Sequence, residues 1–531
     1  MNNDIFKLHY IRLFAWSITL LFAITATAQV QPEWDASLGG NIWEELNSVE
    51  QTSDGGFIMA GFTSSSQDAD VEGINNGGGD YWVVKTDNLG EIEWENNFGG
   101  NQLERPWKVL PTSDGGYIVA GYSPSNISGT KTEDSRGADD FWVVKMDNVG
   151  NYEWDRTYGG DNLDWCYDMI QLNDGGFLLG GRSLSGISGE KTEANNGSWD
   201  FWLVKIDADG NLLWDKTLGG DQEDLLTEMQ LAPDGDVLIA GGTSSSMSGD
   251  VTSPTEGGKD FWLVKVSSTD GDLLWERRYG GTAEDEVFSF VQTTDGGVLL
   301  GGGSQSNANP PFKSENNFGS VDMWIVKTDA TGSVEWDRTF GGDGLDNCYS
   351  VRQNSIGYYI ISGFSESVMT GNKTTGTNGG FDYWLLYLNE SGDKQWETSL
   401  GGAQNDVLEN AFQIDDGGYL LAGHSSSDVS GDKMDPSNGN NDFWIIKTLC
   451  DVELELNDTT VCPNEPVTID LYNGTNCVDC TWNWSDGNTT DSIRTIITDV
   501  ATTYNITLTD GVGCSQEGSI TISVLPTAID L

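Results

Sequence analysis

The sequence predicts an all-β chain built from repeated four-stranded units, and three observations lead to this fold class. A tryptophan, an acidic residue and then a glycine pair recur at a spacing of sixty or sixty-one residues. Glycine is abundant (68 residues) and proline is sparse (12 residues), which suits short strands joined by tight turns. Runs of alternating β-branched and aromatic residues lie between Gly, Asp and Asn turns. The recurring tryptophans are Trp34, Trp94, Trp154, Trp214, Trp275, Trp336 and Trp396.

One unit, residues 105–160, shows the four expected strands. A short extended run begins at Arg105, and a tight turn at 113–116 leads to a second strand at 117–123. A polar loop then leads to a third strand that begins at Asp140, and a further turn leads to the fourth. Four antiparallel strands per unit, repeated, are typical of the blades of a β-propeller.

The number of units predicts seven blades and the way in which a ring would close. The array begins with a fourth strand at Pro32 and stops after a third strand at Lys447. Pairing of the N-terminal strand into the last blade would remove the open sheet edges. We therefore expect a seven-bladed β-propeller with N-terminal-strand closure over residues 29–449. The alternative, an open solenoid of β-units, leaves the first strand unexplained.

A second tryptophan column and four further tryptophans have different expected roles. The second column is Trp82, Trp142, Trp202, Trp262, Trp324, Trp384 and Trp444. We expect these rings to pack between blades, where a large side chain fills the wedge between twisted sheets. Four tryptophans outside both columns lie in or beside loops and are the candidates for stacking on a ligand. They are Trp43, Trp107, Trp165 and Trp199.

An acidic residue follows the second glycine of each pair by four residues. These acids are Glu44, Glu104, Asp164, Asp224, Asp285, Asp346 and Asp406. If the blade register holds, they ring the mouth of the central channel on the face that carries the long loops. Several of them could then hold Ca²⁺, the candidate cofactor, which takes carboxylate and carbonyl oxygens. In the favoured alternative, each acid accepts backbone N–H bonds and shapes its turn.

Catalytic motifs are scarce. The chain has two histidines, His9 in the leader and His424 in a second strand, so a zinc site made of several histidines is excluded. No phosphate-binding or dinucleotide-binding fingerprint appears in a strand–turn–helix context. A non-enzymatic protein is therefore expected. The alternative is a polysaccharide-active hydrolase or lyase that uses carboxylates of the channel mouth, with Asp164 or Asp346 as the residues to change.

The first 28 residues are typical of an export signal. Lys7 and Arg12 precede an apolar run, and Ala26-Thr27-Ala28 forms a cleavage site. Removing residues 1–28 takes away Asp4, Lys7 and Arg12, so the net charge changes from -57 to -58. Such a charge repels nucleic acid and anionic membrane surfaces. We therefore expect a secreted or cell-surface protein with no integral membrane segment after signal removal, and with the export machinery as one partner.

The cysteines divide the chain into two parts. Cys166 and Cys348 occupy the same place in two first strands that should lie far apart on the ring, so we expect buried, unbonded thiols. The other five cysteines fall in the last eighty or so residues, where export and density favour disulfides. The expected pairs are Cys462 with Cys514 and Cys477 with Cys480. Cys450 is left unassigned, and the Cys477–Cys480 pair could instead be a redox or metal pair.

The sixty-residue period stops at about Cys450, and a different β module follows. Residues 450–531 contain five or more short runs with alternating apolar residues. This spacing predicts a small β-sandwich of the immunoglobulin type. Such modules commonly serve as spacers or adhesion units.

Both patterns resemble those of a known group of proteins. The repeat DGGYIVAGYS…DFWVVKMD…G…W…GG resembles the sixty-residue repeats of large exported proteins of Bacteroidota. The tail pattern CPxEPVTID…WSDG…YxxTxTDxxGC is similar to the Ig-like or PKD-like modules that follow them. The resemblance spans roughly residues 30–447 and 450–524. It implies secretion, often through the type IX route, with adhesion or polymer binding; the C-terminal sorting domain common in such proteins is not found after Leu525.

Taken together, these observations predict an exported, non-enzymatic binding or adhesion protein. Its ligand would be a glycan, a protein or a surface polymer, recognised through the long-loop face of the propeller. The two alternatives are the polysaccharide-active enzyme and a purely structural spacer.

Overall fold

The computed structural model describes two parts of the chain. In the first part it describes residues 32–448 except 256, 355–356 and 415–417, and in the second part residues 459–461, 466–471, 481–487, 493–509 and 515–524. The predicted signal at 1–28, the boundary at 449/450 and the five C-terminal cysteines lie outside the described residues. All named elements within them are strands, which confirms the all-β prediction. None of the described segments is a helix of the length and apolarity needed to cross a membrane.

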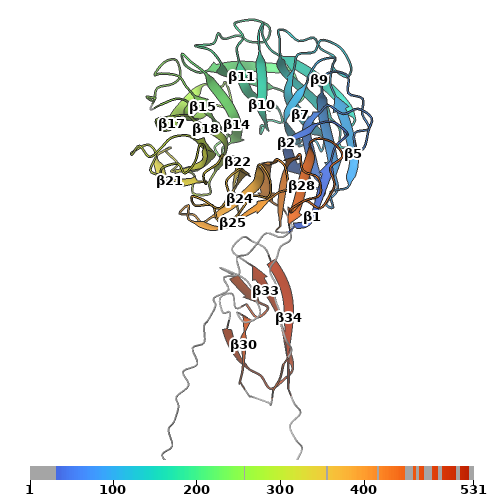
Figure 1. The fold of residues 1–531 in the computed structure, drawn as a ribbon, viewed down its shortest axis with the longest axis vertical. Helices are drawn as coiled ribbons and strands as arrows, with labels where there is room; N and C mark the ends of the chain where they lie inside the picture. The colour runs from blue at the N-terminus through green and yellow to red at the C-terminus, as the bar shows by residue number, and fades with distance from the viewer. Residues whose placement is uncertain are drawn as a thin grey trace, which may run out of the picture.

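The first part of the chain forms four-stranded antiparallel sheets, each made of consecutive strands (Figure 1). The first three sheets are β2 (Glu44–Gln51), β3 (Phe57–Thr63), β4 (Asp80–Thr86) and β5 (Ile92–Phe98); β6 (Arg105–Pro111), β7 (Tyr117–Ser123), β8 (Asp140–Met146) and β9 (Tyr152–Tyr158); and β10 (Asp164–Gln171), β11 (Phe177–Ser183), β12 (Asp200–Ile206) and β13 (Leu212–Leu218). The next three are β14 (Asp224–Leu231), β15 (Val237–Thr243), β16 (Asp260–Val266) and β17 (Leu273–Tyr279); β18 (Asp285–Gln292), β19 (Val298–Ser304), β20 (Asp322–Thr328) and β21 (Val334–Phe340); and β22 (Asp346–Gln353), β23 (Tyr359–Ser365), β24 (Asp382–Leu388) and β25 (Lys394–Leu400).

A further sheet joins the two ends of this part of the chain. Its strands are β26 (Asp406–Gln413), β27 (Tyr419–Ser425), β28 (Asp442–Thr448) and the N-terminal strand β1 (Pro32–Leu38). β1 pairs antiparallel with β28 at the sheet edge. We call this pairing of β1 with β28 the seam. Asp35 stabilises the seam, because its Oδ2 accepts hydrogen bonds from Met434 N (2.9 Å) and Trp444 Nε1 (3.0 Å). Residues more than 400 positions apart therefore lie side by side in one sheet.

A tight turn joins β2 to β3, β6 to β7 and β10 to β11, whereas longer loops lead to the third strands of these sheets. Between β2 and β3, Asp54 Oδ1 accepts a hydrogen bond from Gly56 N at 3.1 Å, and Gly55 has a φ of 85°. A side chain is strained at such a φ, so glycine is required there. The same position is a positive-φ glycine between β6 and β7 and between β10 and β11, at Gly115 and Gly175. This explains why the Asp-Gly-Gly signal predicts the first hairpin of each unit.

Large aromatic rings fill the space between neighbouring sheets, as the second tryptophan column predicts. Every tryptophan of that column is fully buried. Trp202 of β12 lies 4.8 Å from Phe141 of the preceding sheet, and its Nε1 donates to Asp215 Oδ2 at 3.1 Å. The same contact joins Trp82 of β4 to Phe443 of β28, also at 4.8 Å. The last sheet therefore packs against the first.

The first strand of every sheet carries a β-bulge at the same place. The pairing of β2 with β3 shifts register between Leu46 and Ser48, and the corresponding shift recurs in β6, β10, β14, β18, β22 and β26. A bulge inserts one extra residue and re-aims its side chain. In Figure 1 the labelled first strands β2, β10, β14 and β22 lie nearest the centre, whereas β5, β17, β21 and β25 lie at the rim. The bulges therefore decide which side chains face the central space.

The second part of the chain contains two further sheets. One has the order β29 (Thr459–Val461), β34 (Ser515–Val524), β33 (Thr502–Thr509) and β31 (Thr481–Trp484), and the other pairs β30 (Pro466–Asp470) with β32 (Ile493–Ile497). Trp482 and Trp484 are buried in their shared core with Leu508 and Ile522. This part is thus a small β unit with its own hydrophobic core.

Candidate functional site

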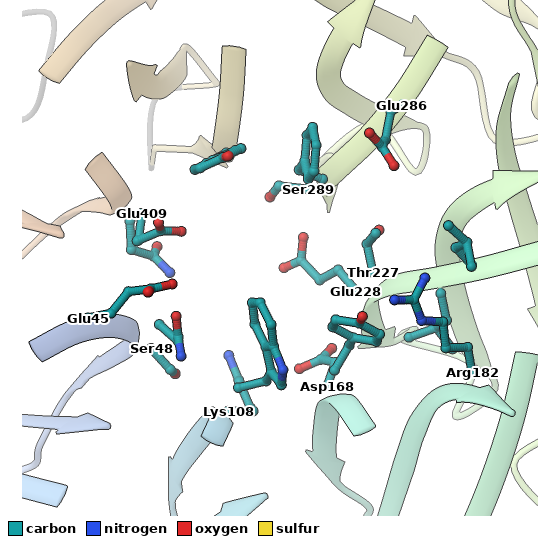
Figure 2. A pocket seen from close by; sticks show the side chains of 18 of the residues that line it. Glu45, Ser48, Lys108, Asp168, Arg182, Thr227, Glu228, Glu286, Ser289 and Glu409 are labelled. Carbon is teal, nitrogen blue, oxygen red and sulfur yellow. The ribbon is translucent and has the colours of Figure 1, made fainter. Parts of the chain in front are cut away.

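A central cavity of about 410 Å³ is enclosed by the seven bulged strands (Figure 2). This volume lies within the range of roughly 300–1,000 Å³ that is typical of ligand pockets. The extra residue of every bulge lines the cavity. These residues are Asn47, Trp107, Tyr167, Thr227, Phe288, Tyr349 and Glu409. The cavity therefore presents a different side chain from each repeat, on rigid strands.

Most charged side chains at the cavity have an opposite charge beside them. The ion pairs are Lys108–Glu50 (2.9 Å), Arg352–Glu228 (3.7 Å), Arg105–Glu45 (2.6 Å) and Lys259–Glu286 (3.1 Å). Backbone groups hold two of the acids: Glu228 Oε2 accepts a bond from Phe290 N (2.8 Å), and Asp168 Oδ2 accepts one from Met229 N (2.6 Å). Figure 2 shows Glu228, Asp168 and Lys108 around one common space. The lining is polar and is held in place by these bonds.

Burial changes the ionisation of three side chains at or beside the cavity. Burial raises the pKa of Asp168 to about 7, although Lys108 opposes this rise. Burial, and then the charge of Glu45, raises the pKa of Glu409 to about 8. Burial lowers the pKa of His424, whose Nδ1 lies 3.8 Å from Glu409 Oε1. At neutral pH the Glu409 carboxyl is therefore mostly protonated and able to donate a hydrogen bond.

Aromatic rings form part of the cavity wall. The rings of Trp107 and Tyr167 lie 5.0 Å apart, and those of Phe288 and Tyr349 lie 4.9 Å apart in an edge-on arrangement. The Trp107 Nε1 atom is buried and has no hydrogen-bond partner among the described residues. Buried indole N–H groups usually have a partner. This wall therefore offers apolar ring faces to the cavity.

Three aromatic rings surround the guanidinium of Arg182, which also lines the cavity. Its central carbon lies 4.4 Å from the ring centroid of Trp165, 4.6 Å from that of Trp199 and 5.2 Å from that of Tyr167. These distances are within the range of favourable cation–π contacts. Trp165 is fixed in turn, since its Nε1 donates to Asp139 Oδ2 at 2.7 Å. We call Arg182 and these three rings the Arg182 box.

The four tryptophans singled out from the sequence do not share one location. Trp165 and Trp199 lie 5.2 Å apart in the Arg182 box, and Trp107 contacts the box through Tyr167. Trp43, by contrast, is 42% exposed in the connection before β2 and does not line the cavity. Of the four candidates, Trp107 alone lines the cavity, whereas Trp165 and Trp199 lie behind Arg182, which does line it.

The seven recurring acids lie inside their turns and do not ring the channel mouth. All are fully buried, and none lines the cavity. Asp164 is representative: its Oδ2 accepts bonds from Gly160 N (2.7 Å) and Ser185 Oγ (2.7 Å). Glu104 does the same with Gly100 N (2.8 Å) and Ser123 Oγ (2.9 Å). The expectation of a carboxylate ring is corrected, because each side chain bends back to the glycine pair of its own connection. The members are Glu44, Glu104, Asp164, Asp224, Asp285, Asp346 and Asp406.

Within the part of the chain that the structure describes, no three or more His, Cys, Asp or Glu side chains are grouped so that they could hold a metal ion. Calcium binding by the seven acids therefore has no geometric support there. Cys166 and Cys348 are buried and unbonded, as expected from their places in the repeat. The disulfides expected for Cys462, Cys477, Cys480 and Cys514 lie outside the described residues.

The bulge residues other than Trp107 were missed because they follow no residue pattern. The third residue after each recurring acid is Asn47 in one repeat, Trp107 in the next and Tyr167 in the one after. The residue before it is apolar or a cysteine in every repeat, whereas this position changes in size and charge. That internal variation between repeats is the signal in the sequence that could have found the channel lining.

Comparisons with known proteins give only distant likenesses. No protein-family model matches the chain. The chain is 23% identical over 429 residues to the regulatory protein FlaEY of Caulobacter vibrioides, and the match covers 61% of this chain and 44% of that protein. The chain thus spans less than half the length of that relative.

Similar solved structures include the WD40 domain of Neurospora crassa Pan2, with a TM-score of 0.41 at 8% identity, covering 76% of this chain and 89% of that one. They also include a copper-containing fungal alcohol oxidase of the AA5 family, with a TM-score of 0.43 at 9% identity, covering 93% and 99%. A putative gluconolactonase has a TM-score of 0.30 at 12% identity, covering 79% and 94%. Likenesses this distant bear on neither activity nor ligand. The chain is an all-β protein of repeated four-stranded sheets with a propeller-like fold.

Proposed function

We propose that this protein is an exported, non-enzymatic binding protein that recognises a glycan in the central channel of a seven-bladed propeller. The observation that carries the proposal is the cavity of about 410 Å³ lined by one bulge residue from every repeat. The leader-like N-terminus and the resemblance to exported repeat proteins support export. The C-terminal β unit serves in this proposal as an Ig-like spacer or adhesion module.

The chemistry of the lining favours a sugar over an apolar ligand. Trp107 and Tyr167 offer ring faces that suit the C–H faces of a pyranose. Asn47, Thr227 and Glu228 offer the donors and acceptors that sugar hydroxyl groups need. Bulges on rigid strands hold these groups in place, which reduces the entropy lost on binding. The site therefore lies in the channel rather than on the long loops.

Trp107→Ala tests this placement. Loss of a stacking ring should weaken binding of the best oligosaccharide from a glycan array by at least about tenfold. Trp43→Ala is the matched control, because Trp43 is an exposed loop tryptophan away from the cavity. Calorimetry on both variants decides the matter: equal weakening by the two, or weakening by Trp43→Ala alone, would move the site to the loop face.

A second candidate is a polysaccharide-active hydrolase or lyase, and one observation favours it. Glu409, with a pKa of about 8, lies near Glu45, which is ion-paired with Arg105 at 2.6 Å. Two carboxyls in such different environments can divide the roles of acid and base. This candidate predicts product release from the same oligosaccharides and its loss in Glu409→Gln, measured by reducing-end or double-bond assays. Binding without turnover by the wild-type protein would eliminate it.

A further inference from the structure

Arg182 is bonded differently from the other described arginines. The other eight donate to a carboxylate or to a backbone carbonyl: Arg105, Arg136, Arg156, Arg277, Arg278, Arg338, Arg352 and Arg494. For Arg182, no described carboxylate lies within ion-pair distance, and its buried Nε has no hydrogen-bond partner among the residues that the structure describes. In a chain with 83 acidic and 26 basic residues, such a cation is conspicuous.

The box holds this cation rigidly at the cavity wall. Trp165 and Trp199 contact the guanidinium at 4.4 and 4.6 Å, and Tyr122 stacks on Trp165 at 5.2 Å with the ring planes 20° apart. Stacking on ring faces leaves the N–H edge of a guanidinium free to bond. Figure 2 shows Arg182 at the edge of the cavity, on the side of Asp168 and Thr227. Arg182 is hydrogen-bonded to Tyr167 and has no carboxylate partner among the described residues, so it presents a fixed positive charge to whatever enters the cavity.

The charge balance around the cavity leaves this cation uncompensated. Lys108 and Arg352 have acidic partners at 2.9 and 3.7 Å. Because burial raises the pKa values of Asp168 and Glu409 to about 7 and 8, these two carboxyls carry little negative charge under mildly acidic conditions. An incoming anion would therefore meet Arg182 as an unpaired positive group.

We propose that the Arg182 box is a carboxylate subsite and that the glycan bound in the channel contains a uronic acid. This inference rests on the glycan-binding function proposed above. A planar carboxylate matches the two-pronged donor edge of a guanidinium. A singly charged carboxylate is balanced by one cation, whereas a doubly charged phosphate would keep an uncompensated charge beside the single Arg182 guanidinium. Trp107, which also lines the cavity, would stack on the same or the neighbouring sugar ring.

The test compares trigalacturonate with its carboxyl-reduced counterpart, trigalactose, on the whole mature chain by calorimetry. A charged hydrogen-bonded pair supports about a tenfold to hundredfold preference for the uronate. Arg182→Gln should abolish that preference while leaving weak binding of the neutral sugar, and Arg182→Lys should retain part of it. Arg338→Gln is the matched control, because Arg338 also stacks on a tryptophan, at 5.6 Å, but lies on β21 outside the cavity lining.

The outcomes separate the two proposals. Equal binding of both sugars by the wild-type protein, with loss in Trp107→Ala, would leave the glycan function standing and overturn the carboxylate subsite. Absence of binding to either sugar and to the array would overturn both. If instead a short peptide with a free C-terminal carboxylate binds in an Arg182-dependent way and its amide does not, the uronate assignment is wrong. A melting temperature equal to that of the wild type shows that Arg182→Gln still folds.

Discussion

Trp202→Ala is expected to lower the free energy of unfolding by about 3–5 kcal/mol, because it removes a large ring from a closely packed interior. Trp202 is fully buried, packs at a tilt against Phe141 of the neighbouring sheet and donates a hydrogen bond to Asp215. Its loss creates a cavity between two sheets and leaves the Asp215 carboxylate without that donor. Both effects act at the interface that holds consecutive sheets together.

Denaturant unfolding followed by tryptophan fluorescence and circular dichroism measures this effect. Trp43→Ala serves as the control, since a ring that is 42% exposed should change stability by well under half as much. Trp202→Phe should lie between the two, because it keeps the aromatic contact and loses the hydrogen bond. A Trp202→Ala variant as stable as Trp43→Ala would show that the column does not carry the contact between sheets.

Stability should fall as the pH rises from about 5 to 8, and Asp140→Asn should remove part of that fall. Asp140 opens β8 and is fully buried, and burial raises its pKa from 3.8 to about 7, with Asp164 adding to the rise. The folded state therefore binds a proton that the unfolded state has released, so stability is greatest at low pH and is lost as the pH rises toward 7. Over this range one such site accounts for on the order of 2 kcal/mol.

The asparagine variant keeps the acceptor for Arg136 N and Gly137 N and has no proton to lose. Its advantage over the wild type should grow from pH 5 to pH 8 in thermal melts. Asp147→Asn is the control, since Asp147 is exposed in a hairpin and hydrogen bonds from Asn151 lower its pKa, so it is ionised throughout this range. A constant difference between Asp140→Asn and the wild type at all pH values would contradict the buried-acid explanation.

The elements of the fold could be predicted because local chemistry repeats with the period of the sheet. Gly55 needs its positive φ in a hairpin turn, and Trp202 needs the space between two sheets; both requirements recur in the other repeats. The strand that begins at Pro32 was expected to pair with the last unit of the array. It has the pattern of a fourth strand but no first three strands before it, and the last unit ends after its third strand. The structure places it beside β28.

The site could be predicted only in part. Trp107, Trp165 and Trp199 stood out because they lie outside both tryptophan columns; Trp107 lines the cavity, and the other two contact Arg182 at its wall. The recurring acids, such as Asp164, were misplaced at the channel mouth. Their spacing predicts a turn, but it does not show in which direction the carboxylate side chain points. Arg182 was missed because the rings that surround it come from other segments of the chain. The spacing of residues along one strand cannot predict a contact between segments.

The seam between β1 and β28 makes the last sheet dependent on both ends of the array. Asp35 and Trp444 are separated by 409 residues, so their contact closes a very long loop. Contacts of such range form late, after local hairpins have assembled. During synthesis β1 emerges long before its partner β28. The last sheet therefore has only the three strands β26, β27 and β28 until β1 pairs with β28. The seam is the point at which folding finishes and where unfolding has its natural start.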